Sequence, residues 1–308
     1  MILSVSRRTD IPAFYAEWFF HRVKEGFACV RNPMNPRRIR TVSIRPEEVE
    51  CMVFWTKNPT PMLSRLDEIR LFNYYFQFTL TPYGRDLECR LPDKDVLAET
   101  FRRLSDKVGP ERIVWRYDPA LMSREIDETY HLLHFEKISR QLASYTKRCV
   151  LSFVDLYRKT RKNLSGTTIR EVHEEEVVSL AGKMTAIARS YGIEIRTCAE
   201  KADLSAWGIT PGKCIDDKLI ETISGRTLNA RKDRNQRTEC GCVESVDIGA
   251  YDTCLHRCLY CYAGASGNCK AHHPHSPLLV GKLTEAAKLD CSQSSSDVNS
   301  SAKKIVPI

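Results

Sequence analysis

Short apolar runs recur six times in the N-terminal two thirds of the chain, and polar residues cluster at the end of each run. The runs are rich in β-branched and aromatic residues and are too short for buried helices, so they predict β-strands. They cover positions 2–5, 52–55, 74–79, 113–115, 149–154 and 193–196.

Helical patterns lie between these runs. The clearest has apolar residues at the three-and-four spacing of one helix face, namely Val177, Leu180, Ala181, Met184, Ile187, Ala188 and Tyr191. Further helices are expected at 12–25, 60–70, 93–107 and 125–147. Such alternation predicts an α/β fold with a parallel sheet and helical crossovers. We therefore expect residues 1–200 to form a partial (β/α)6 TIM-like barrel, with its site at the carboxyl ends of the strands.

The character of the chain changes after residue 200. A short helix is expected at 215–223, and a charged connector at 226–239 leads into a cysteine-dense stretch. We expect residues 201–286 to form a cysteine-rich iron–sulfur cluster-binding segment packed on the barrel. Residues 287–308 are rich in serine and poor in large apolar residues, which predicts a disordered tail.

Composition and charge narrow the class of protein. The chain is 42% hydrophobic, and no run approaches the roughly 20 apolar residues of a membrane helix. Arg7 and Arg8 follow the N-terminal apolar run, which is the reverse of a signal peptide. We expect a cytoplasmic protein with no membrane partner. The net charge of +8 favours an anionic partner, and nucleic acid is one candidate.

Thirteen cysteines are many for a protein of a reducing compartment. In such a compartment, cysteine-rich patterns indicate metal binding or catalysis more often than disulfides. Nine of them follow residue 197, and six lie between 240 and 269. The earlier four fall in strand or helix patterns and are expected to be core thiols: Cys29, Cys51, Cys89 and Cys149. Cys269 and Cys291 remain unassigned.

Three cysteines, Cys254, Cys258 and Cys261, have the spacing C-x3-C-x2-C. Most ferredoxin-type clusters use four cysteines, so three thiolates leave one iron of a cubane open. An open metal position is what catalysis needs. The aromatic Tyr260 stands directly before the third cysteine.

This motif resembles that of the radical S-adenosylmethionine (SAM) superfamily, and Tyr260-Cys261-Tyr262-Ala263 resembles its spore photoproduct lyase-like branch. The resemblance implies a [4Fe–4S] cluster whose open iron binds the amino and carboxylate groups of SAM. It also implies reductive cleavage of SAM to a 5′-deoxyadenosyl radical and an electron donor such as flavodoxin or ferredoxin.

Nearly the whole chain resembles an uncharacterised bacterial family, catalogued as a domain of unknown function, with this cysteine motif at its C-terminus. The matching stretches are 4–10, 53–59, 115–119, 197–200 and 239–263. In the wider superfamily the motif follows the first strand, whereas here it follows the sixth. The superfamily's residues outside the cysteine loop are therefore not transferred to this chain.

Polar residues after the strands are candidates for holding SAM. Arg7, Lys57 and Arg116 are favoured, because cationic side chains bind carboxylates. Tyr260 is a further candidate, because it stands directly before the third cysteine of the motif. The neighbouring strand-end residues are Arg8, Asp10, Asn58, Asp118, Asp155 and Glu200. An alternative for all of them is a ring of salt bridges that closes the barrel end. Catalytic residues stay unassigned, and no hydrolase triad order, Walker loop or dinucleotide glycine pattern is present.

Four more cysteines match the ligand number of a second, fully ligated cluster: Cys198, Cys214, Cys240 and Cys242. Ordinary buried thiols are the alternative for some of them. Zinc competes with iron at the motif, because further N and S ligands lie nearby: His256, His272, His273, His275 and Cys269. The sequence thus predicts a radical SAM enzyme of unknown substrate. A non-catalytic iron–sulfur electron-transfer protein and a zinc-stabilised nucleic-acid-binding protein are the alternatives.

Overall fold

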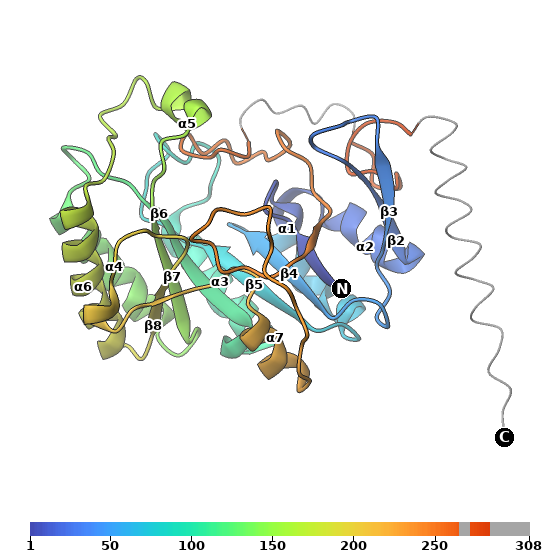
Figure 1. Cartoon of the computed structure of the whole chain (residues 1–308), viewed down its shortest axis with the longest axis horizontal. Coiled ribbons are helices and arrows are strands. Elements are labelled where there is room, and N and C mark those ends of the chain that lie inside the picture. The colour runs from blue at the N-terminus through green and yellow to red at the C-terminus, as the bar shows by residue number, and fades with distance from the viewer. Residues whose placement is uncertain (265–271, 284–308) are drawn as a thin grey trace, which may run out of the picture.

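The structure is a computed structural model that describes residues 1–264 and 272–283. Its centre is a parallel sheet of eight strands in the order β10-β1-β4-β5-β6-β7-β8-β9, which confirms the α/β class (Figure 1). The six predicted strands are the inner ones: β1 Ile2–Val5, β4 Cys51–Thr56, β5 Tyr74–Thr79, β6 Ile113–Ala120, β7 Arg148–Phe153 and β8 Glu194–Thr197. The edge strands β9 Thr210–Pro211 and β10 Val246–Asp247 were not predicted.

Helices connect the strands where the sequence predicts them, as α1 Ile11–Phe14, α2 Ala16–Glu25, α3 Lys94–Val108, α4 Glu128–Leu142 and α6 Glu174–Ser190. The short helix α5 Arg158–Asn163 was not predicted. The predicted helix at 12–25 breaks at Tyr15, and the one at 60–70 is the 3-10 helix η1 Thr60–Ile69. Short 3-10 turns, η2 Pro110–Arg112 and η3 Ser205–Trp207, precede β6 and β9. An antiparallel hairpin, β2 Phe27–Arg31 and β3 Ile39–Ser43, was not predicted. None of the described helices is long and apolar enough to cross a membrane.

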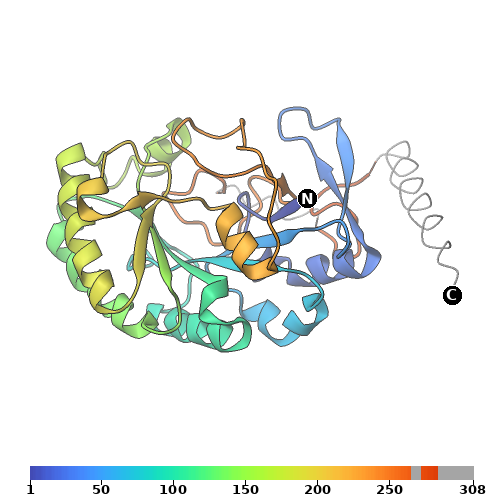
Figure 2. The same ribbon diagram turned by 60° about the horizontal axis from the view of Figure 1, so that its bottom comes forward.

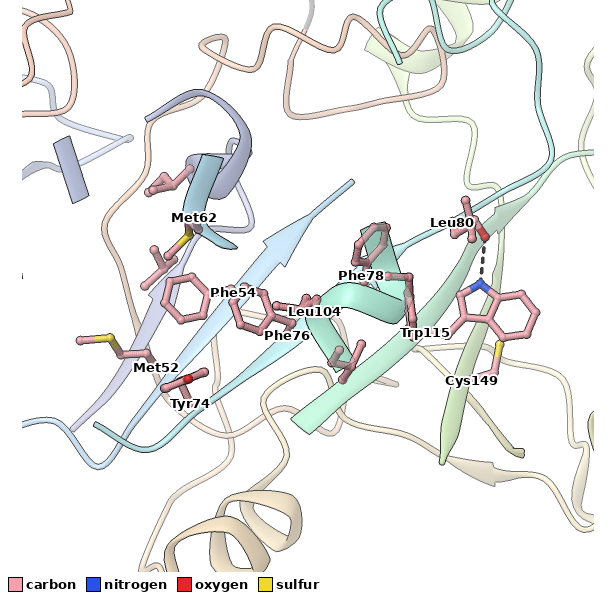
Figure 3. Close-up of a cluster of buried hydrophobic side chains, with 14 of the residues drawn as sticks. Met52, Phe54, Met62, Tyr74, Phe76, Phe78, Leu80, Leu104, Trp115 and Cys149 are labelled. Carbon is pink, nitrogen blue, oxygen red and sulfur yellow. Dashed lines mark hydrogen bonds between the residues drawn. The ribbon is translucent and has the colours of Figure 1, made fainter. Parts of the chain in front are cut away.

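Both faces of the sheet are buried. Alternate residues such as Phe54, Phe76 and Trp115 pack against the crossover helices (Figure 3). The residues between them, such as Val53 and Val114, pack against α7 Asp217–Ser224 and the segment that follows it. Figure 2 shows α7, in orange, on the opposite side of the sheet from α3. Period-two alternation therefore divides each strand between two apolar layers.

The segment after residue 200 completes the sheet instead of only packing on it. It adds β9 beside β8 and β10 beside β1, so it reaches both edges. The residues next to these edge strands meet, because the Val243 N–H donates to the Ile215 carbonyl at 3.3 Å. In the described residues no hydrogen-bonded ladder joins β9 to β10. The predicted tail, 287–308, lies outside the described residues.

The indole of Trp115 is a sensitive point of the outer apolar layer. Trp115 is fully buried, and its Nε1–H donates to the Leu80 carbonyl at 2.9 Å (Figure 3). We expect Trp115→Phe to lower the free energy of unfolding by about 1–3 kcal/mol, because it leaves a buried carbonyl unpaired and a small void. Denaturant titration measures the change. Trp207→Phe is the control, since Trp207 is 45% exposed, and an equal loss there would contradict the assignment.

A buried histidine should make stability depend on pH. The Tyr117 hydroxyl donates to His131 Nδ1 at 2.7 Å, so the neutral ring donates its Nε2–H to the Leu121 carbonyl at 2.6 Å. Burial lowers the pKa of His131 below its ordinary value of 6.5. As pH falls below 6.5, His131 therefore becomes protonated in the unfolded chain but stays neutral in the folded chain. The free energy of unfolding then falls by up to about 1.4 kcal/mol per pH unit. His131→Gln should flatten this slope between pH values near 7 and 5 in denaturant titrations, and an unchanged slope would refute the prediction.

Candidate functional site

A cavity of about 560 Å³ opens at the carboxyl ends of the strands. That volume lies in the range of small-molecule and cofactor sites. Its walls come from the residues that follow β1, β4, β7 and β8, from residues within β6, and from the chain at 214, 235–242 and 251–264. It contains two groups of cysteines. The loop cysteines are Cys254, Cys258 and Cys261, and the edge cysteines are Cys198, Cys214, Cys240 and Cys242.

The loop cysteines lie over the carboxyl ends of the central strands. Cys258 forms an antiparallel bridge with Glu88, and the Leu259 N–H donates to the Leu87 carbonyl at 2.9 Å. Cys258 and Tyr260 also pack in an apolar cluster with Leu121 from the loop after β6. A loop that is distant in sequence is thus fixed at the predicted mouth of the sheet.

The chemistry of the loop cysteines fits a metal cluster. Burial raises the pKa of Cys254 to about 12, although the backbone N–H groups of His256 and Asp10 lower it. Burial likewise raises the pKa of Cys258. All three loop cysteines line the same cavity. A metal that binds such a sulfur displaces the thiol proton, and three cysteines at this spacing suit an iron–sulfur cluster.

The buried carboxylate of Glu88 holds this loop in place. It was not predicted from the sequence. Glu88 is 1% exposed, and Lys57 Nζ donates to its Oε1 at 2.6 Å. The Tyr260 hydroxyl and the Lys94 ammonium also donate to Glu88, and Lys57 Nζ lies 2.9 Å from the Tyr260 hydroxyl. Burial would raise the pKa of Glu88, but the two ammonium groups lower it to about 2. Glu88 follows no strand directly, so no strand-end pattern identified it.

Asp10 fixes the same loop from the end of β1. Its Oδ1 accepts the Ala13 N–H at 2.9 Å and thereby caps α1. Its Oδ2 accepts the Lys57 N–H at 2.7 Å and lies 2.8 Å from His256 Nε2. One strand-end carboxylate thus joins the first crossover, the end of β4 and the cysteine loop.

The edge cysteines converge from three separate stretches of chain. Cys198 follows β8, Cys214 follows β9, and their sulfurs lie 3.2 Å apart. Cys242 precedes β10, and its sulfur accepts the Cys214 N–H at 3.2 Å. The thiols of Cys240 and Cys242 are neighbours as well, and that contact contributes most to lowering the pKa of Cys240 to about 7.

The four predicted SAM-binding side chains divide between the two cysteine groups. Lys57 and Tyr260 lie with the loop cysteines, as described above. Arg116 lies with the edge cysteines, since its Nη1 donates to Cys214 Sγ at 2.8 Å and its Nε donates to Asp118 at 3.0 Å. Arg7 donates to the Ser245 hydroxyl at 3.1 Å, and its guanidinium lies over the Trp55 ring. All four side chains line the cavity.

The zinc ligands that the sequence offered do not gather in the described residues. His256 bonds to Asp10, and His272 Nδ1 bonds to the Leu279 carbonyl at 2.7 Å. His273 and His275 contact each other at a ring distance of 5.6 Å. Within residues 1–264 and 272–283, no group of three or more histidine, cysteine, aspartate or glutamate side chains is arranged to hold a metal ion. A cluster differs from one ion because each of its cysteines binds a different iron.

The cysteines outside the cavity follow the prediction with two corrections. Cys29, Cys51 and Cys149 are buried, but Cys29 is disulfide-bonded and is therefore not the core thiol that was expected. Cys89 is exposed, so its assignment to the core was wrong. It lies next to the buried Glu88 in the irregular loop after β5, where the chain turns its side chain outward. Cys269 and Cys291 lie outside the described residues.

Comparison with known proteins places the chain in a family without assigning an activity. No curated protein matches it. The family model described as "Domain of unknown function (DUF1848)" matches residues 2–263, which include all of the described sheet and both cysteine groups. The match covers well over half of the chain, and the protein therefore belongs to the DUF1848 family.

Proposed function

We propose that this protein is a radical SAM enzyme that acts on a substrate still to be identified. The observation that carries the proposal is that Cys254, Cys258 and Cys261 share one cavity with strand-end cations. Three thiolates leave an iron of a cubane without a protein ligand. The cavity beside them is large enough for a small-molecule cofactor.

In this proposal the loop cysteines hold a [4Fe–4S] cluster. When bound, a cluster of this kind supplies one electron that cleaves SAM to methionine and a 5′-deoxyadenosyl radical. The protein's part is to bind and orient. Asp10 and the Lys57–Glu88–Tyr260 contacts hold the loop. The guanidinium of Arg7 lines the cavity and is the proposed partner of the SAM carboxylate.

We also propose that the sheet with its edge strands is the partial TIM-like barrel expected from the sequence. The contact between Val243 and Ile215 supports this, because it brings residues from the two edges of one sheet together. The carboxyl-end position of the cavity is that of TIM-barrel active sites.

Anaerobic reconstitution with iron and sulfide tests the function. Wild-type protein mixed with SAM and dithionite should produce 5′-deoxyadenosine, which chromatography with mass spectrometry quantifies. The variant C254A/C258A/C261A should produce none and should lose about four irons, the content of one cubane. Cys89→Ala is the matched control and should keep full activity, because that thiol is exposed and lies outside the cavity.

Two outcomes would replace the proposal. Bound iron and sulfide without 5′-deoxyadenosine from wild-type protein would favour an electron-transfer protein. A colourless protein that contains zinc would favour the zinc-stabilised alternative. Retained 5′-deoxyadenosine formation in C254A/C258A/C261A would also show that the loop cysteines are not the site.

A further inference from the structure

The edge cysteines form a second sulfur-lined wall of the cavity. They meet where the two edges of the sheet approach each other, since Cys198 and Cys214 follow β8 and β9, and Cys240 and Cys242 precede β10. All four side chains line the cavity, and none of them is in a disulfide. Four thiols gathered from three stretches of chain form a complete ligand set for a cluster.

Hydrogen-bond donors point at these sulfurs. Arg116 is 4% exposed, and its Nη1 donates to Cys214 Sγ at 2.8 Å. The backbone N–H groups of Cys214 and Ile215 donate to Cys242 Sγ at 3.2 Å and 3.4 Å. Neutral thiols are weak acceptors, whereas thiolates on a cluster accept such bonds strongly. These donors would therefore stabilise negatively charged sulfur atoms on this wall of the cavity.

The charge of the wall leads to the same conclusion. Arg116 is paired with Asp118, and Arg7 lies 3.7 Å from Asp233. The Arg116 guanidinium contacts Cys214 Sγ, and both guanidinium groups line the cavity together with the edge cysteines. Four thiolates on an iron–sulfur cluster carry a net negative charge, which two guanidinium groups would offset.

We propose that Cys198, Cys214, Cys240 and Cys242 hold a second, fully cysteine-ligated iron–sulfur cluster. Each cysteine binds a different iron, so the contact of 3.2 Å between Cys198 and Cys214 describes the free thiols and opens when the cluster is present. The proposal is independent of the radical SAM function, because it concerns ligands that the loop cysteines do not share.

Iron content separates the two centres. After anaerobic reconstitution, wild-type protein should bind about eight irons and about eight sulfides, the content of two cubanes. The variants C254A/C258A/C261A and C198A/C240A should each keep about four irons. The control Cys149→Ala removes a buried thiol from the outer apolar layer and should keep about eight.

Spectroscopy of the wild-type protein tests the same inference without relying on folding of a variant. Reduced protein should show two electron paramagnetic resonance signals, and SAM should change only one of them. A single signal, zinc in place of iron in C254A/C258A/C261A, or no iron in that variant would overturn the second cluster. Failure of the proposed function would look different: both signals and all irons would be present, and wild-type protein would form no 5′-deoxyadenosine.

Discussion

Replacing Glu88 with glutamine should lower the free energy of unfolding by about 3–5 kcal/mol, although the new side chain has the same shape. The carboxylate is 1% exposed and accepts bonds from both Lys57 and Lys94. The neutral amide would leave these ammonium groups without their countercharge in a buried place. The loss should lie toward the lower end of the range, because the Lys94 side chain is 24% exposed and keeps part of its hydration.

Denaturant titration of the metal-free chain measures this loss. Glu99→Gln is the matched control, since it removes one carboxylate from an ion pair with Arg102 on the surface of α3. That change should cost less than about 1 kcal/mol, the usual worth of an exposed pair. Equal losses of unfolding free energy in the two variants would show that Glu88 does not hold the cysteine loop in place. We further expect Glu88→Gln to retain less iron, because Tyr260 loses a fixed partner.

Replacing Asp10 with alanine should have the second large effect. Its Oδ2 accepts the Lys57 N–H and contacts His256 Nε2, so both groups would lose this partner, the first partly buried and the second buried. Each unpaired buried donor costs about 1–3 kcal/mol. The lost cap on α1 adds about 1 kcal/mol. We therefore expect a strong loss of stability together with a looser cysteine loop.

Asp93→Ala is the matched control for the cap. Asp93 is the exposed N-cap of α3 and accepts the Asp95 N–H at 2.8 Å, but it holds no second element. Thermal unfolding should show a clearly smaller shift for it than for Asp10→Ala. Iron content after reconstitution should fall only in Asp10→Ala. Unchanged iron binding there would refute the role of Asp10 in positioning the loop.

The order and direction of the inner strands follow from local patterns that the sequence carries. Apolar runs such as the one at β5 bury both faces of a strand, and helices with one apolar face lie between them. The sequence does not predict the edge strands β9 and β10, because each has only two residues and therefore shows no apolar periodicity. Their strand form depends on pairing with β8 and β1, which only the assembled sheet provides.

The cysteine motif and the strand-end cations were also identified from the sequence alone. Their spacing and their place after apolar runs are local properties, and these are sufficient to predict which residues meet at one end of a parallel sheet. The sequence could not reveal that Glu88 lies beneath Tyr260, because that contact joins an irregular loop to a segment 172 positions away.

The division of the cations between the two cysteine groups was likewise decided only by the tertiary structure. Lys57 directly follows β4 and Arg116 lies within β6, but both follow a predicted apolar run and are equivalent in sequence pattern. The curvature of the sheet and the return of the chain to both of its edges set Arg116 against Cys214 and Lys57 against Glu88. Local sequence thus determined the secondary-structure elements and the types of ligand residue. Long-range packing determined which side chains face each other, because a contact between distant strands depends on the position of every strand that lies between them.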